Sequence, residues 1–246
     1  MEYASLGVQA LDKALDGGIP KGQTLLVTGT PGCGIELFAK QFAAAGVGSE
    51  SVVYIATAEL DEEVLSTMKK FGWREDIKII NIGSRYYENV LAKRLEVSKR
   101  RYEGLTMKDI MRHTGPVLDE DRINFLTALT YEVSSIPPPF RLVVDSLDFF
   151  LEYYEHGNVL SALRTIKAHA QHSNSLALFT MLKDVYDPRT ASGIEEIVDV
   201  VIELERQREG MEFVRNVLIK KVRNHPEKTG IFPIDIGAKG FTAKSR

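Results

Sequence analysis

The 246-residue sequence contains a single cysteine, Cys33, so no disulfide can form within one chain. It has no apolar leader at its N-terminus, and no apolar run comes near the ~20 residues that a membrane-spanning helix needs. It also lacks an excess of basic residues, because 34 acidic and 31 basic side chains leave a net charge of -3. These absences predict a protein of a reducing cytoplasm without membrane insertion, and any affinity for nucleic acid would have to come from a local patch.

The composition is that of an ordinary globular protein, with 44% hydrophobic and 26% charged residues. This length suits one large α/β domain, and neither an internal repeat nor a low-complexity linker interrupts it. We therefore expect a single domain over residues 1–246. Within it, residues 1–22 should form an N-terminal helix and an entry segment, and residues 85–139 a variable, mostly helical middle segment.

Strand-like and helix-like segments alternate along most of the chain. Compact apolar runs at 24–28, 51–56, 77–81, 141–145 and 176–181 are typical of buried parallel strands. Helical periodicity is found at 6–15, 37–42, 62–71, 123–133 and 158–169. The last third contains strand-like runs at 198–204 and 213–222 and a short pair near Phe232 and Phe241. This pattern predicts a mostly parallel central sheet flanked by helices, with a β-rich C-terminal part.

A glycine-rich segment at 29–36, reading G-T-P-G-C-G-I-E, follows the first predicted strand. Its glycines fit the phosphate-binding pattern G-x-x-x-x-G-K-[ST], in which backbone N–H groups bind an anion. Ile35 stands at the lysine position and Glu36 at the hydroxyl position, so the usual contacts to the γ-phosphate and Mg²⁺ are missing. The candidate nucleotide-contacting residues of this loop are Gly29, Thr30, Pro31, Gly32, Cys33, Gly34, Ile35 and Glu36.

Glu36 has two interpretations. Its carboxylate could ligate Mg²⁺ in place of the missing hydroxyl. Alternatively, it lies in the first turn of a helix, where the dipole favours an acid, and pairs with a solvated Lys40 four residues later. We favour the second interpretation. Cys33 is expected to be a small loop residue rather than a redox or metal residue.

Asp145 ends a Val-rich strand and fits the acid that holds Mg²⁺, directly or through water, in phosphate-loop proteins. An acid at this place, or the next residue Ser146, could equally cap a following helix. The position downstream of a strand and a glycine loop favours the metal role. Asp145 and Glu36 are therefore the candidate Mg²⁺ ligands.

The order and spacing of several segments resemble the KaiC-like branch of the RecA superfamily of P-loop ATPases. These segments are 7–12 (GVQALD), 17–22 (GGIPKG), 54–63 (YIATAELDEE), 71–73 (FGW), 143–147 (VVDSL) and 221–223 (KVR). The resemblance covers nearly the full length and implies a RecA-like P-loop fold with ATP or ADP and Mg²⁺ as cofactors. It also implies oligomers in which Lys221 and Arg223 reach into the nucleotide of a neighbouring subunit.

The sequence departs from this family at the residue that activates the attacking water. The family has two adjacent glutamates at the end of the second strand, of which the first is the base; here Ala58 stands there and Glu59 remains. Lysine, hydroxyl and base are thus replaced together, and the loss of charge stabilisation or of a base typically costs orders of magnitude in rate. We expect a catalytically degenerate RecA-type protein that acts through protein association or regulation, with a protein partner or as a homo-oligomer, and with weak or no ATP binding.

An unconventional oligomeric ATPase is the first alternative. In it, Glu36 and Asp145 would share the metal ion and Glu59 would act as the catalytic base. Lys221 or Arg223 of a neighbouring subunit would supply the missing positive charge.

A DNA-binding RecA-like module is the second alternative. Its candidate contacts are the basic residues Lys93, Arg94, Lys99, Arg100 and Arg101. Such a run, interleaved here with Glu96 and followed by a lone Tyr102, is more typical of a solvated helix face.

Overall fold

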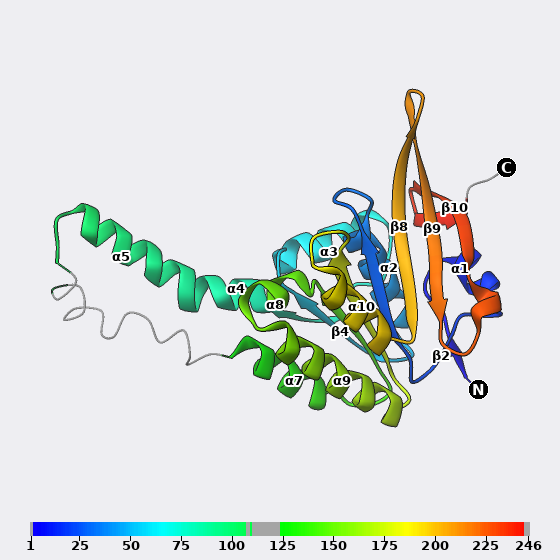
Figure 1. The fold of residues 1–246 in the computed structure, drawn as a ribbon, viewed down its shortest axis with the longest axis horizontal. Helices are drawn as coiled ribbons and strands as arrows, with labels where there is room; N and C mark the ends of the chain where they lie inside the picture. The colour runs from blue at the N-terminus through cyan, green and yellow to red at the C-terminus, as the bar shows by residue number, and fades with distance from the viewer. Residues whose placement is uncertain (1, 107–108, 110–123, 244–246) are drawn as a thin grey trace.

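The computed structural model describes residues 2–106, 109 and 124–243 (Figure 1). Within these residues, a nine-stranded sheet has the order β11-β10-β9-β8-β3-β7-β6-β4-β5, and a small second sheet pairs β1 with β2. The strands are β1 (Tyr3–Ala4), β2 (Ile19–Pro20), β3 (Thr24–Gly29), β4 (Ser51–Ala56), β5 (Lys78–Asn81), β6 (Phe140–Asp145), β7 (Leu176–Leu182), β8 (Val200–Glu209), β9 (Glu212–Val222), β10 (Gly230–Gly237) and β11 (Gly240–Ala243).

The large sheet has a parallel part and an antiparallel part. β5, β4, β6, β7, β3 and β8 run parallel to one another, whereas β9, β10 and β11 continue the sheet with antiparallel pairs. β3 is buried along its whole length, as a strand covered on both faces must be. The predicted α/β fold with a β-rich C-terminal part is confirmed.

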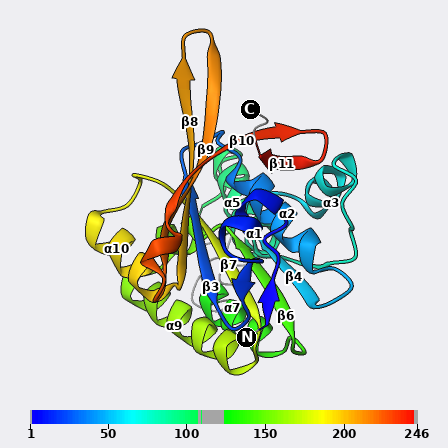
Figure 2. The same ribbon diagram turned by 90° about the vertical axis from the view of Figure 1, so that its right-hand side faces the viewer.

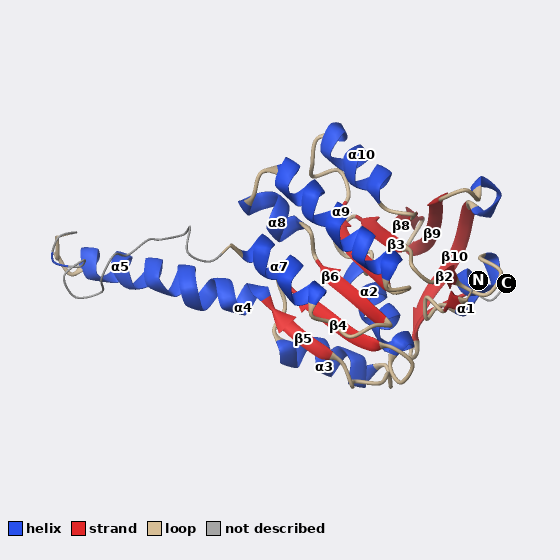
Figure 3. Cartoon of the chain, turned by 90° about the horizontal axis from the view of Figure 1, so that it is seen from below, coloured by secondary structure: helices blue, strands red, loops and turns tan. Residues whose placement is uncertain are grey.

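Helices cover both faces of the sheet (Figure 3). They are α1 (Gln9–Ala14), α2 (Ile35–Gly46), α3 (Asp61–Lys70), α4 (Ile82–Tyr86), a π-helical turn η1 (Tyr87–Leu91), α5 (Ala92–Tyr102), α7 (Phe125–Ser134), α8 (Asp148–Tyr153), α9 (His156–His172), α10 (Pro188–Ile197) and a 3-10 turn η3 (Pro226–Lys228). One core lies under α1, α2 and α3, and a second lies under α7, α8, α9 and α10. Among the described residues, no helix is both long and apolar enough to cross a membrane.

Several elements differ from the sequence-based prediction. α8, α10 and the short strands β1 and β2 were not predicted. α10 begins with Pro188 in its first turn, and the side chain of Asp187 accepts hydrogen bonds from the backbone N–H groups of Arg189 and Thr190. The helix predicted over 123–133 is α7, and residue 123 lies outside the described residues. The rest of the middle segment from 107 to 123 is outside them too, except residue 109.

A buried ion pair lies at the edge of the sheet where β4 and β6 begin. The Nε of Arg141 is 2.5 Å from Oε2 of Glu50, and both side chains are almost fully buried. The same guanidinium donates to the backbone carbonyls of Ser5 and Phe42 and covers the Phe42 ring at 4.5 Å. Arg141 therefore ties the N-terminal segment and α2 to the sheet.

Candidate functional site

The glycine loop joins β3 to α2 at the carboxyl edge of the parallel strands. Gly32 and Gly34 have φ values of 80° and 100°, in the left-handed region that favours glycine. A Cβ on Gly34 would also lie 3.0 Å from the ring of Phe241. Thr30 and Pro31 are exposed at the outside of the loop. The loop therefore keeps a shape that could present backbone N–H groups to an anion.

The two replaced positions in the loop have different surroundings. Ile35 is 7% exposed and belongs to the same core as Phe38 and Phe241, so its side chain contributes to packing. Glu36 is exposed in the first turn of α2. Cys33 is buried, and burial followed by the charge of Glu36 raises the pKa of its thiol. The protonated, buried thiol fits the small loop residue that the sequence predicts.

The side chain of Lys40 is only 1% exposed, so the predicted solvated ion pair between Lys40 and Glu36 is wrong. Its Nζ is 2.6 Å from Oε2 of Glu59 and donates to the backbone carbonyl of Glu36 at 3.3 Å. Long side chains on a helix lean toward its N-terminus, which brings this ammonium beneath the first turn of α2. Lys40 therefore pairs with the acid on the loop between β4 and α3.

Tyr54 contacts both Asp145 and Lys40 and so connects Asp145 to this ion pair. The Tyr54 hydroxyl donates to Oδ2 of Asp145 at 2.5 Å, and the Thr180 hydroxyl donates to Oδ1 at 2.6 Å. The Nζ of Lys40 lies 5.8 Å from the centroid of the Tyr54 ring. Burial, followed by the charge of Asp145, raises the pKa of Tyr54 well above its usual value, so the phenol remains a donor. The sequence analysis did not identify Tyr54 and Thr180, because each is a single polar residue within an apolar strand.

The acids of the described structure do not gather into a set of oxygen ligands that could enclose Mg²⁺ by themselves. Glu59 is bound by an ammonium, and each carboxylate oxygen of Asp145 already accepts a hydrogen bond. Glu36 stands at the position of the metal-binding hydroxyl and makes no hydrogen bond with Asp145 in the described structure. Within the described residues, no group of three or more His, Cys, Asp or Glu side chains could hold a metal ion.

Arg206 is a positive charge beside the loop that the sequence reading missed. β8 and β9 form a hairpin that extends beyond the rest of the sheet (Figures 1 and 2). From this hairpin, Nη1 of Arg206 donates to the carbonyl of Gly32 at 3.2 Å, and the guanidinium covers the Phe213 ring at 4.6 Å. The hairpin thereby supports the outside of the loop.

Lys221 and Arg223 lie at the opposite edge of the sheet, where β3 begins. Lys221 Nζ donates to the carbonyls of Glu195 and Val198 at 2.6 and 2.7 Å. Arg223 Nε is 2.6 Å from Oδ1 of Asp199. The structure therefore does not bring these two residues to the glycine loop of their own chain, and it satisfies both of them within that chain.

Asp199 is 1% exposed and is the centre of this second cluster. Its carboxylate accepts from Lys167 at 2.6 Å and from the backbone and hydroxyl of Thr24. Burial opposes ionisation, but the hydrogen bonds from Lys167 and Thr24 outweigh it and hold the pKa of Asp199 below its usual value. The ionised carboxylate therefore stabilises the folded state.

Replacing Asp199 with asparagine should lower the free energy of unfolding by about 2 kcal/mol at pH 7. Because the folded-state pKa is lowered, the stabilisation is complete above the unfolded-state pKa of about 3.9 and is lost as the pH falls through the folded-state value. Urea unfolding followed by circular dichroism between pH 7 and pH 3 measures this difference. Asp235→Asn, at an exposed position on β10, is the control, and an Asp199→Asn effect independent of pH would contradict the prediction.

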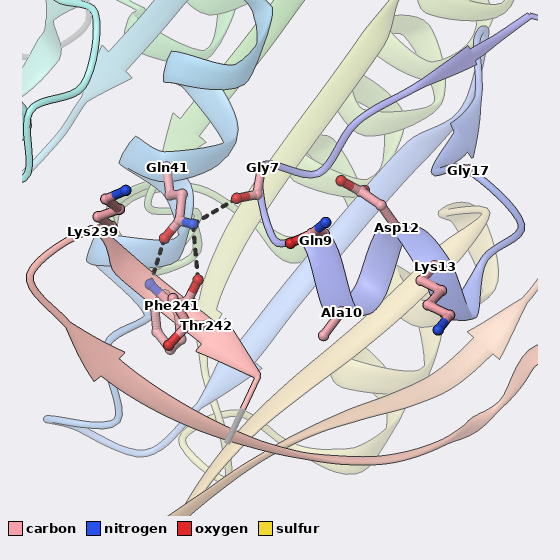
Figure 4. A pocket seen from close by; sticks show the side chains of 10 residues that line it. All are labelled: Gly7, Gln9, Ala10, Asp12, Lys13, Gly17, Gln41, Lys239, Phe241 and Thr242. Atoms are coloured by element: carbon pink, nitrogen blue, oxygen red, sulfur yellow. Dashed lines mark hydrogen bonds between the residues drawn. The ribbon is translucent and has the colours of Figure 1, made fainter. Parts of the chain in front are cut away.

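A separate pocket of about 760 Å³ lies between α1, α2 and β11 (Figure 4). At its wall, the side-chain amide of Gln41 donates to the carbonyls of Gly7 and Phe241 and accepts from the N–H of Phe241. None of the residues that line this pocket belongs to the loop at 29–36. The pocket is therefore distinct from the phosphate-loop region.

Comparison with known proteins places the whole chain among relatives of one kind. The sequence model of the KaiC ATPase matches residues 4–245. A UPF0273 protein of Pyrococcus furiosus is 25% identical over 243 residues, which cover 96% of this chain and 91% of that protein. The circadian clock oscillator protein KaiC of Thermostichus vulcanus is 25% identical over 236 residues, which cover 93% of this chain but only 42% of the clock protein.

A similar fold is found among solved structures. The crystal structure of a KaiC-like protein from Pyrococcus horikoshii matches with a TM-score of 0.69 at 23% identity, and the match covers 99% of both chains. The structural match supports the RecA-like arrangement of the sheet and helices.

Proposed function

The chain belongs to the KaiC family of ATPases, and from this premise we propose that it is a catalytically degenerate member that acts through association with protein partners or further copies of itself. In this proposal the RecA-type fold serves as a scaffold, ATP binds weakly or not at all, and hydrolysis is lost. The glycine loop remains as part of the scaffold.

The ion pair between Lys40 and Glu59 is the observation that carries this proposal. A P-loop ATPase needs a positive charge that meets the phosphates and a carboxylate that can act on water. Here the ammonium of Lys40 is buried and bound to the one remaining glutamate of the pair, 2.6 Å away. The ammonium is enclosed by the protein and holds the partly exposed carboxylate against itself, which leaves neither group free for catalysis in this proposal.

The replacements in the loop support the same conclusion. Ile35 is packed in the core, and Ala58 is exposed but has no group that could accept a proton. Glu36 adds a negative charge at the end of the loop, which opposes the binding of a triphosphate. The backbone N–H groups of the loop and the guanidinium of Arg206, which is held by the carbonyl of Gly32, remain as attractions for phosphate, which is why we propose weak rather than tight binding.

The contacts of Lys221 and Arg223 bear on the alternative of an unconventional oligomeric ATPase. Their cationic groups are held by Asp199 and by backbone carbonyls of their own chain. Reaching the nucleotide of a neighbour would require these contacts to break. We therefore keep the degenerate scaffold as the proposed function.

The purified chain supplied with Mg-ATP should release no more phosphate than its Asp145→Ala variant, and calorimetry should detect weak or no nucleotide binding. The reason is that the phosphate-contacting lysine and the catalytic base are both missing. A variant with Ile35→Lys, Glu36→Thr, Ala58→Glu and Lys40→Ile, which restores the family residues and removes the internal ammonium, is the comparison and should bind Mg-ATP more tightly. Robust hydrolysis by the wild-type chain that depends on Asp145 would refute the proposal.

A further inference from the structure

Helix α5 forms an arm that projects away from the body of the protein (Figures 1 and 3). It continues directly from α4 and η1, and none of its residues is buried. Because no side chain of α5 is buried, the arm gains little stability from packing against the body. A surface of this kind would gain stability from a ligand that covers it.

The arm is strongly basic although the whole chain is acidic. Five of its residues are basic and one is acidic, whereas the full chain has a net charge of -3. Arg100 pairs with Glu96 at 2.6 Å along the helix. Among the residues that the structure describes, no carboxylate lies within ion-pair distance of Lys93, Lys99 or Arg101. These three cations are therefore available to an anionic ligand.

Exposed tyrosines lie at the far end of the arm and at its base. Tyr102, which ends the arm, is 95% exposed, and Tyr87 on η1 is 53% exposed. Tyr131 on α7 and Tyr153 at the end of α8 are 70% and 47% exposed. The base is one packed unit, because the ring of Tyr86 lies 4.8 Å from that of Tyr153 and Arg85 donates to Glu132, next to Tyr131.

We propose that the α5 arm and these tyrosines bind single-stranded nucleic acid. The cations would contact phosphates, and the exposed phenol rings would stack on unpaired bases, which is the combination that single-strand binding surfaces use. A duplex offers no free base faces for such stacking. An anionic membrane fits less well, because the exposed large apolar side chains of the helix are Leu95 and Tyr102 alone, and Lys99 lies on the same face between them.

Fluorescence anisotropy with a labelled, mixed-sequence single strand of 30 nucleotides tests this proposal with the full chain. The triple variant Lys93→Gln, Lys99→Gln, Arg101→Gln should bind at least tenfold more weakly in 50 mM salt, and its slope of log affinity against log salt should fall by about 2. The control removes the same charge from exposed lysines of the body, with Lys13→Gln, Lys69→Gln and Lys239→Gln. This control should bind within about twofold of wild type.

Stacking is tested separately at Tyr102. Tyr102→Ala should weaken binding about tenfold, and Tyr102→Phe, which keeps the ring, should bind like wild type. The proposal is overturned by absence of binding, by equal losses in the two triple variants, or by duplex binding as tight as single-strand binding. It is equally overturned if the arm binds vesicles of anionic phospholipid but not nucleic acid. A third contrary result is that nucleic acid does not bind while light scattering shows a different oligomer mass for the arm variant than for wild type.

Discussion

Replacing Glu59 with leucine should lower the free energy of unfolding by about 3 kcal/mol, although Glu59 lies on a loop and is one-third exposed. The cause is Lys40, whose ammonium would lose its carboxylate while it remains 1% exposed. For a chain of this size, thermal denaturation should show a fall in melting temperature of roughly 6–12 °C. An acid retained as a catalytic base would show no such effect on stability.

The double variant Lys40→Met, Glu59→Leu is the decisive comparison, because it removes the buried charge together with its partner. Its stability should return to within about 1 kcal/mol of wild type, since a methionine fills the volume of the lysine stem in an apolar helix face. Glu62→Leu, three residues further along the chain and exposed, controls for the loss of an acid. If Glu59→Leu and Glu62→Leu were equally stable, the ion pair would have no structural role.

Replacing Arg141 with methionine should have the largest effect on stability, a loss of about 3–5 kcal/mol. The substitution leaves the carboxylate of Glu50 buried without a cation, and it removes the donors that satisfy the carbonyls of Ser5 and Phe42. Denaturant unfolding followed by circular dichroism measures the loss as a lower midpoint at an unchanged slope.

Two further variants separate the contributions of Arg141. Arg141→Lys keeps the charge but not the planar group that reaches three acceptors, so it should recover only part of the loss. Arg74→Met is the matched control, because Arg74 is exposed and donates to a single carbonyl, that of Val47. A loss for Arg74→Met as large as that for Arg141→Met would contradict the argument from burial.

The fold could be predicted from sequence because its signals are local. The apolar run at 51–56 coincides with β4, and the run at 24–28 with β3 apart from the added Gly29. Glycines then mark where β3 ends and α2 begins. α10 had a readable signal that was overlooked, since Asp187 and Pro188 are typical of the cap and the first turn of a helix.

The contacts of the candidate site could not be predicted in the same way, because they join distant segments. The spacing of four residues favours a pair between Glu36 and Lys40, but burial of Lys40 and the position of the loop after β4 select Glu59. Tyr54 and Asp145 are 91 residues apart and meet only because β4 and β6 are neighbours in the sheet. Local patterns show which residues are polar but not which of them face each other.

The contacts of Gln41 determine when the core around α2 can finish packing during synthesis of the chain. Its buried amide forms hydrogen bonds with the backbone of Gly7 and with the backbone of Phe241, which lies 200 residues further along the chain. A buried amide without partners costs free energy, so the packing around α2 cannot be finished while the last strand is still inside the ribosome. Closure of this core therefore has to wait until β11 has left the ribosome, and a chain that stops short of β11 would leave the site of Gln41 open to water.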